Sequence, residues 1–259
     1  MQRTQGICSA TRHLNSEGMK RLFAVIVWLL LYSSTFGMEA WESNYTRLLQ
    51  KYVKTSGVQY SVWKENSADV QALKEIINQI GASGPSSQER EAQLAYYINA
   101  YNALVLAGVL DRYPLRSVRD VAPFYGFFTQ NNITVAGNRT SLYALERKLL
   151  IPRFQEPRIH FAINCASRSC PPLRSEAYTA ARLDQQLNEM TRAFLNNSSE
   201  AIKPAGNGYA VSRIFDWYKD GFVASGGTVG FINKYRNEPV PPDAKISFQD
   251  YNWNLNEAK

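Results

Sequence analysis

Residues Gln88 to Arg112 read QEREAQLAYYINAYNALVLAGVLDR, and the rest of the chain is expected to pack around them. Apolar side chains recur along this stretch at the spacing of a helix. They are Leu94, Tyr97, Ile98, Tyr101, Leu104, Val105 and Leu110. Little polar face is left, which is typical of a helix buried on most sides, and Pro114 ends the pattern. We therefore predict a central core helix over residues 88–112.

Shorter elements of both kinds are predicted around this helix. Periodicity and turn residues indicate helices over 45–52, 68–80, 141–150, 179–194, 212–217 and 228–235, and strands over 58–62, 131–135, 158–164, 201–204, 209–211 and 245–255. Ser141 and Thr179 are predicted N-caps. Because helices and strands do not alternate regularly, we predict an α+β fold, with helices packed on a small, mostly antiparallel sheet.

The first forty residues have the pattern of a targeting segment. Two basic residues at 20–21 precede an apolar run over 22–32 and small residues at 33–35, the order found in secretory signal peptides. The run is shorter than the roughly 20 residues that span a bilayer. We predict an N-terminal extension with a signal peptide at about 19–40, and one soluble periplasmic or secreted domain over 41–259.

Composition and charge restrict the function classes. Hydrophobic residues make up 45% of the chain and charged residues 20%, as in ordinary globular proteins. The formal net charge of +7 is spread thinly along the chain, which argues against a nucleic-acid groove. No cofactor-binding motif is present, and we predict no cofactor.

The residues best suited to chemistry lie in one segment, HFAINCASRSCPP, which runs from His160 to Pro172. The predicted mature chain has a single histidine, His160, and two cysteines, Cys165 and Cys170. All three fall at the exit of the predicted strand over 158–164, where loops held by a scaffold often carry function. This segment is therefore the candidate site.

The same segment, together with YINAYNAL over residues 97–104, resembles the family catalogued as domain of unknown function 547, DUF547. The resemblance extends over residues 141–146, 157–173, 178–187, 212–218 and 251–256. The function of the family is unsettled. Its strand-borne histidine is similar to that of papain-like and transglutaminase-like cysteine hydrolases, and this analogy implies a related fold.

One hypothesis is a cysteine-dependent hydrolase or acyltransferase acting on a peptide or amide, with His160 as the base. Cys165 would lie on the opposite strand face from His160 and about 16 Å away, so Cys170, after a short loop, is the favoured nucleophile, with Cys165 as the other candidate. Glu146 is the predicted orienter of the imidazole. The remaining candidates are Asn99 and Asn102 as oxyanion donors, and Ser167, Arg168 and Arg174 as substrate contacts.

Other interpretations of the same residues stay open. A disulfide between Cys165 and Cys170 suits an exported protein and would make His160 an ordinary buried residue of a non-enzymatic envelope protein with a binding surface. A reducible bond would give a redox role, although four residues separate the cysteines rather than the two of thioredoxin-like motifs. The three side chains are also acceptable zinc ligands. The aromatic stretches 124–128 and 215–218 fit either core packing or a groove for a peptide or sugar.

Overall fold

Helix α5 (Arg90–Arg112) lies at the centre of the fold, as the sequence predicts. The computed structural model describes residues 39–121 and 125–258. Every residue of α5 from 92 to 106 is buried, so neighbouring elements cover the helix on all sides. The helix ends at Arg112, one residue before the Tyr113–Pro114 peptide, because Pro114 cannot continue the hydrogen-bonding pattern.

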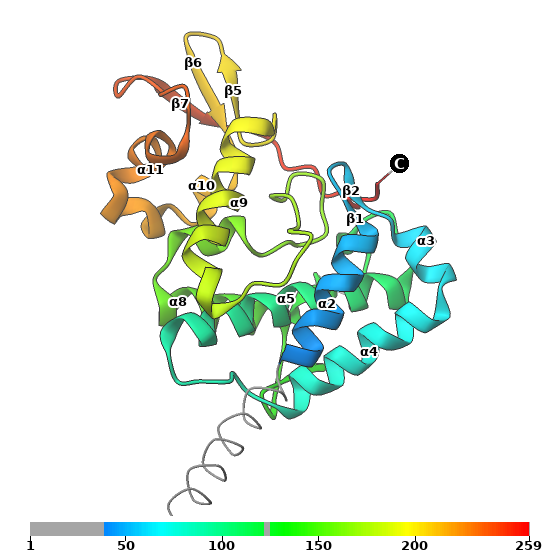
Figure 1. Cartoon of the computed structure of the whole chain (residues 1–259). Coiled ribbons are helices and arrows are strands. Elements are labelled where there is room, and N and C mark those ends of the chain that lie inside the picture. The colour runs from blue at the N-terminus through cyan, green and yellow to red at the C-terminus, as the bar shows by residue number, and fades with distance from the viewer. Residues whose placement is uncertain (1–38, 122–124, 259) are drawn as a thin grey trace, which may run out of the picture. The chain divides into compact units, whose positions relative to one another are not determined.

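The N-terminal helices pack around this centre (Figure 1). They are α2 (Glu39–Tyr52), α3 (Tyr60–Glu65) and α4 (Ser67–Ala82), of which α4 packs along α5. The predicted strand over 58–62 is wrong beyond its first residue: β1 (Val53–Lys54) and β2 (Gly57–Val58) form a short hairpin, and α3 follows. Tyr60 and Trp63 are both fully buried, and a spacing of three residues places them on one face of a helix.

The strands form small sheets. Strands β3 (Ile133–Val135) and β4 (Asn138–Thr140) make an antiparallel hairpin. In a three-stranded sheet, β5 (Ile202–Ala205) pairs antiparallel with β6 (Gly208–Val211), which pairs parallel with β7 (Lys245–Phe248). The α+β class with mostly antiparallel sheets is therefore confirmed. The predicted strand over 245–255 stops at Phe248, and residues 249–258, the C-terminal segment, continue without regular structure.

Short helices occur along the chain from residue 118 to residue 225. They are η1 (Val118–Asp120), α6 (Gly126–Thr129), α7 (Leu142–Ala144), the π-helix η2 (Leu145–Leu150), α8 (Ile151–Phe154), η3 (Pro157–Phe161), η4 (Ala180–Arg182), α10 (Ile214–Trp217) and η5 (Lys219–Ser225). Two are longer, α9 (Leu183–Asn197) and α11 (Gly227–Tyr235). The helices predicted over 179–194 and 228–235 are confirmed.

The predicted strand over 158–164 is wrong, because residues 157–161 form the 3-10 helix η3. The Glu156 side chain accepts a hydrogen bond from the Arg158 amide at 3.1 Å, and Pro157 supplies a φ suited to the first turn. The segment is apolar because it lies between two cores and not because it belongs to a sheet. A short apolar run does not distinguish these cases by periodicity.

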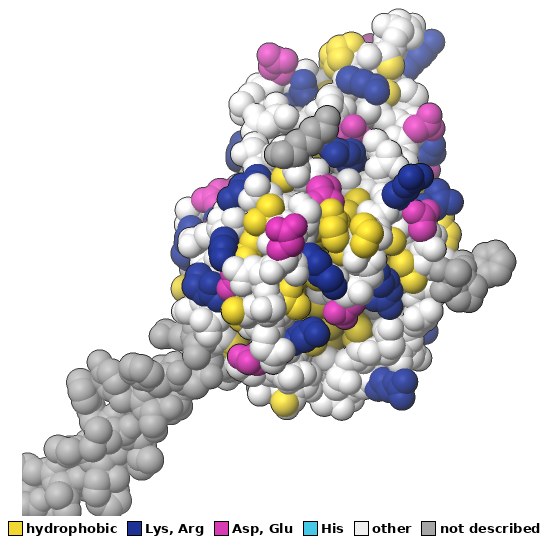
Figure 2. Space-filling model, turned by 90° about the vertical axis from the view of Figure 1, so that its right-hand side faces the viewer, with side chains coloured by type: hydrophobic (Ala, Val, Ile, Leu, Met, Phe, Trp, Pro, Cys, Tyr) yellow, Lys and Arg dark blue, Asp and Glu magenta, His cyan; other side chains and the backbone are white. Residues whose placement is uncertain are grey.

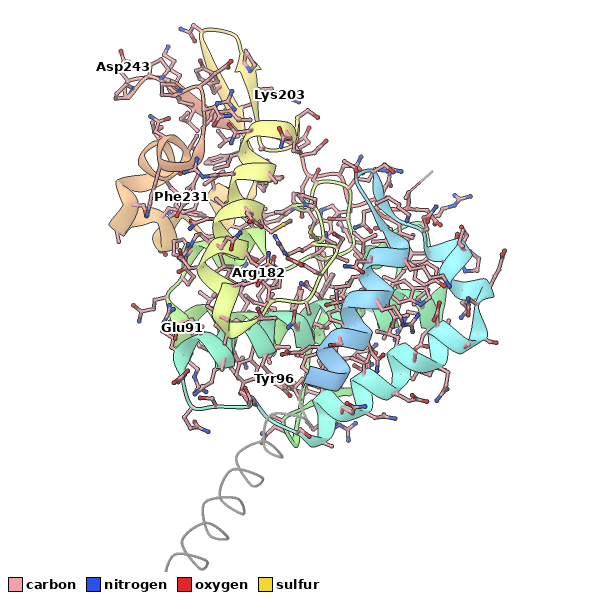
Figure 3. The ribbon with its side chains drawn as sticks, in the orientation of Figure 1. Glu91, Tyr96, Arg182, Lys203, Phe231 and Asp243 are labelled. Atoms are coloured by element: carbon pink, nitrogen blue, oxygen red, sulfur yellow. A yellow bond between two sulfur atoms is a disulfide. The ribbon has the colours of Figure 1, made fainter. Side chains whose placement is uncertain are left out.

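The two cores have different composition. The helical core surrounds α5 and includes Ile159 and Ala162, whereas the aromatic core contains Phe161 with rings from α9, α10, η5 and α11. Figure 3 shows Tyr96 on α5 and Phe231 on α11 in these two parts of the molecule. Phe161 stacks on Phe231 with ring centroids 5.5 Å apart. The chain around His160 is thus held from both sides.

The predicted extension and signal peptide lie outside the described residues, apart from the start of α2. Among the described helices, none combines the length and apolar character needed to cross a bilayer. On the face drawn in Figure 2, Lys and Arg side chains are interspersed with Asp and Glu, in agreement with a charge that is spread thinly.

Candidate functional site

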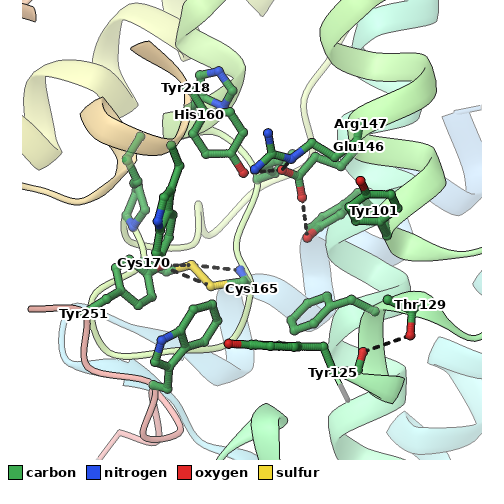
Figure 4. Close-up of a pocket in the computed structure, with 17 residues that line it drawn as sticks. Tyr101, Tyr125, Thr129, Glu146, Arg147, His160, Cys165, Cys170, Tyr218 and Tyr251 are labelled. Carbon is green, nitrogen blue, oxygen red and sulfur yellow. Dashed lines mark hydrogen bonds and ion pairs between the residues drawn. A yellow bond between two sulfur atoms is a disulfide. The ribbon is translucent and has the colours of Figure 1, made fainter. Parts of the chain in front are cut away.

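A cavity of about 450 Å³ opens beside the Cys165–Cys170 loop. Its wall is mostly aromatic, and it is built from α5, α6, η2, η3, α10, the cysteine loop and the C-terminal segment. Figure 4 shows that side chains from these distant parts of the sequence converge on one space. His160, Glu146 and both cysteines line it, so the structure brings together four of the predicted site residues.

Glu146 forms the polar side of the cavity. It lies in the π-helix η2, a kind of helical irregularity that is frequent at functional sites. Its carboxylate accepts hydrogen bonds from the hydroxyls of Tyr101, at 3.2 Å, and Tyr218, and Arg147 Nε lies 3.6 Å away (Figure 4). Burial raises the pKa of Glu146, and the hydrogen bond from Tyr218 opposes that rise. The carboxylate is therefore held by two tyrosines.

His160 is buried in the same wall, with 5% of its surface exposed. Its ring lies against Tyr218, with centroids 3.8 Å apart. Burial, with a smaller contribution from the charge of Arg147, lowers the pKa of His160 to about 3. Its Nδ1 has no hydrogen-bond partner among the described residues, and Glu146 bonds to tyrosines rather than to the predicted imidazole. The imidazole is neutral at ordinary pH.

Cys165 and Cys170 form a disulfide, with their Cα atoms 6.2 Å apart. The sequence left open whether the two cysteines are bridged or free, and in the structure they are bridged. A disulfide provides neither the thiolate that nucleophilic catalysis needs nor thiolate ligands for zinc. Within the described ranges, no group of three or more His, Cys, Asp or Glu residues is placed to hold a metal ion.

Polar groups surround the two sulfurs. The Tyr251 hydroxyl lies 3.2 Å from Cys170 Sγ and 3.3 Å from Cys165 Sγ. The Cys165 amide donates to Cys170 Sγ at 2.9 Å, and Ser167 Oγ lies 2.9 Å from Cys165 Sγ. Ser167, predicted as a substrate contact, is buried against the disulfide and Tyr251. The bond is thus hydrogen-bonded as well as reachable from the cavity.

The two asparagines of α5 have structural roles. Asn102 donates to the Ala162 carbonyl at 2.9 Å and accepts from the Asn164 amide at 2.8 Å. Asn99 makes the same pair of bonds with Tyr178, at 2.7 and 2.8 Å. Both amide groups, predicted as oxyanion donors, already have partners, and neither residue lines the cavity. They fix the backbone that carries the site.

The two arginines predicted as substrate contacts, Arg168 and Arg174, bond to other residues of the chain. Arg168 is exposed and donates to the Glu257 carbonyl at 3.2 Å. Arg174 forms ion pairs with Glu176 and, at 2.8 Å, with Glu189. Neither lines the aromatic cavity, but Arg168 lines a second cavity, of about 660 Å³, together with Cys170. The arginine that lines the aromatic cavity is Arg147, whose guanidinium lies over the Tyr218 ring at 4.1 Å.

The aromatic stretches divide between core and cavity. Phe215 is fully buried in the aromatic core, whereas Trp217 and Tyr218, two and three residues later, line the cavity. Tyr101, Arg147 and Tyr251 were not predicted as site residues. The position of Tyr101 among the apolar residues of α5 indicated only core packing. The resemblance over 251–256 was the one sequence signal that pointed to Tyr251.

Comparison with known protein families gives a match for one part of the chain. Residues 85–195 match the family model described as "Protein of unknown function, DUF547", which confirms the predicted resemblance there. The matched range contains α5, η2, the His160 segment and the disulfide, and it ends before Trp217, Tyr218 and Tyr251. No curated protein and no solved structure matches the chain. The papain-like analogy stays a prediction.

Proposed function

We propose that this chain, whose residues 85–195 place it in the DUF547 family, is an exported, non-enzymatic binding protein that takes a small saccharide into the aromatic cavity. The observation that carries the proposal is the cluster of Trp217, Tyr251 and Trp253 in the cavity wall, called the aromatic platform below. Sugar rings present apolar C–H faces that pack on aromatic rings, and hydroxyls that need polar partners.

The platform is a surface kept open to the cavity. Its rings contact one another, with centroids 4.8 Å apart for Trp217 and Tyr251 and 4.7 Å for Tyr251 and Trp253. Trp217 nevertheless has 39% of its surface exposed. Clustered aromatic side chains that stay partly exposed mark binding surfaces more often than isolated ones do. The cluster therefore supports a ligand with a flat apolar face.

The opposite side of the cavity favours an uncharged ligand with hydroxyl or amide groups. Glu146 and Arg147 carry opposite charges close together, so the site offers planar donors and acceptors with little net charge. A volume of about 450 Å³ lies at the lower end of the range of small-molecule sites, roughly 300 to 1,000 Å³. One or two sugar rings are of suitable size.

The cysteine-hydrolase hypothesis receives less support. While Cys165 and Cys170 are bridged, neither sulfur is available as a nucleophile. A histidine whose pKa is about 3 is also a weak base at neutral pH, because efficient general bases have a pKa near the working pH. Export is part of the proposal because disulfides persist in oxidising compartments and because the sequence predicts a signal peptide.

Tryptophan fluorescence tests the proposal directly. The oxidised protein is titrated with glucose, N-acetylglucosamine and their disaccharides, and we expect a saturable change with at least one of them. Trp217→Ala should abolish the change. Phe248→Ala, which removes an equally exposed aromatic ring outside the cavity, should preserve it. Absence of saturation with every saccharide would overturn the proposal, and saturation with a proline-rich peptide would reassign the cavity.

A further inference from the structure

The structure also assigns a chemical activity to the disulfide. We propose that Cys165–Cys170 is an exchange-active bond that accepts two electrons from small thiols entering the cavity. This inference is independent of saccharide binding, because it depends on the sulfurs and their hydrogen bonds alone.

The bond can be reached from two sides. Both cysteines are only partly buried and line the aromatic cavity. Cys170 also lines a second cavity of about 660 Å³, together with Asn164 and Ser167. A thiolate must approach a sulfur atom before exchange begins, so access is the first requirement, and this pair meets it.

The hydrogen bonds around the sulfurs favour the reduced state. The Tyr251 hydroxyl lies within 3.3 Å of both sulfurs, and the Cys165 amide donates to Cys170 Sγ at 2.9 Å. Hydrogen bonds to an ionised acceptor are about twice as strong as those to a neutral one. The same donors therefore stabilise a newly formed thiolate more than they stabilise the disulfide, and stabilising the reduced form makes a disulfide a stronger oxidant.

Tyr251 suits this role for a further reason. Burial raises the pKa of the Tyr251 hydroxyl, which therefore keeps its proton and remains a donor.

The reaction proceeds by two exchanges. The thiolate of a small thiol attacks Cys165 Sγ, the S–S bond breaks, and its electron pair leaves on Cys170 Sγ as a thiolate. The Cys165 amide and the Tyr251 hydroxyl then hold that thiolate. A second thiolate attacks the sulfur of the bound small thiol and releases Cys165 as a thiolate, giving a free disulfide. Of the two protons lost by the small thiols, one ends on Cys165 and the other passes to solvent, so Cys170 stays a thiolate.

Equilibration with glutathione tests the proposal. The full chain carrying Cys8→Ser, which removes the third cysteine, is incubated at a series of reduced to oxidised glutathione ratios, quenched with acid, alkylated and weighed intact. We expect partial reduction within the accessible ratios. Tyr251→Phe should shift the equilibrium constant toward the disulfide by about tenfold, or about 30 mV for a two-electron couple. Tyr209→Phe, in β6 and outside the cavity, should leave it unchanged.

Two results would overturn the inference. A protein that stays fully oxidised in a large excess of reduced glutathione has a structural bond only. An equilibrium constant unaffected by Tyr251→Phe would show that the hydroxyl does not stabilise the thiolate. Either result can be told apart from a failed saccharide titration, because that titration uses oxidised protein and no thiol.

The order of the steps has its own test. In the Cys8→Ser background, brief exposure of the oxidised protein to reduced glutathione, followed by acid quenching and alkylation, should trap a mixed disulfide at Cys165 and an alkylated Cys170. The opposite preference would reverse the assigned order and contradict the step in which Cys170 leaves.

Discussion

Helix α5 and the segment over residues 157–170 are in contact, yet their backbones are stabilised in opposite ways. The helix satisfies its own backbone groups through regular internal hydrogen bonds, and its side chains serve packing. The segment has only a short 3-10 turn, and beyond it the backbone groups bond to the Asn102 side chain and to the backbone of residues 252–256. Irregular buried backbone is stable only where such partners exist.

Asparagine side chains link the middle of this segment to its surroundings. Asn102 bonds the backbone at Ala162 and Asn164. The Asn164 side chain accepts from the Ala166 amide at 2.8 Å and donates to the Pro171 carbonyl at 2.7 Å. Asn256, in the C-terminal segment, donates to Asn164 at 3.2 Å. The shape of the site is therefore set by a few polar side chains, which makes it sensitive to single substitutions.

At neutral pH, the largest effect is expected from Asn102→Ala. The substitution leaves the Ala162 carbonyl and the Asn164 amide without their partner, and an unsatisfied buried polar group costs roughly 1 to 3 kcal/mol. We expect the free energy of unfolding, measured in urea, to fall by about 3 kcal/mol. Asn78→Ala, at an exposed position of α4, should change it little. A loss below about 1 kcal/mol would show that the segment does not depend on Asn102.

Removing the disulfide should have the next largest effect. Replacing both Cys165 and Cys170 with Ser should lower the free energy of unfolding by about 2 kcal/mol, because the bond closes a short loop. The free energy of unfolding of the reduced wild-type protein should fall by less than that of this variant. The reason is that Tyr251 and the Cys165 amide form stronger hydrogen bonds to the Cys170 thiolate than to a serine hydroxyl. Equal losses would contradict the assigned role of those donors.

The same contrast explains which parts of the fold and of the site could be predicted from the sequence. The helices α4, α5 and α9 follow from apolar spacing, since that spacing directly reflects a local, periodic structure. The segment at His160 was wrongly predicted as a strand because its short apolar run does not distinguish a strand from a buried turn, and Asn102, which fixes the residues after the turn, lies about sixty residues earlier. Histidine, cysteines and Glu146 were found as rare or isolated polar residues. Tyr218 lies in the stretch 215–218, for which the sequence left core packing and a groove open, and only the family resemblance pointed to Tyr251, because nothing local distinguishes a cavity tyrosine from a core tyrosine.

The buried imidazole should make stability depend on pH. His160 has a folded-state pKa of about 3, below its ordinary value near 6.5, so the unfolded chain binds the proton first. This contribution to stability is present above the unfolded pKa and is lost as pH falls from about 6.5 toward 3, at roughly 1.4 kcal/mol per pH unit.

Urea unfolding of the wild type and of His160→Gln, compared between pH 7 and pH 4, measures this slope. The raised pKa of Glu146 acts with the opposite sign, because that stability is lost as pH rises, and it largely cancels in the difference between the two proteins. The variant should have the flatter profile. Parallel profiles would mean that the imidazole titrates freely in the folded protein.

The smallest effect is expected at two predicted N-caps, which the sequence alone does not distinguish. Ser141 accepts a hydrogen bond from the Ala144 amide at 3.1 Å, whereas the Thr179 side chain makes no capping bond. An N-cap bond contributes about 1 kcal/mol, so Ser141→Ala should lower the free energy of unfolding by about that amount and Thr179→Ala by much less. Ser141 begins the turn that carries Glu146, so its loss should also weaken saccharide binding. Equal effects at both positions would mean that the residue type, rather than the bond, determines stability at these caps.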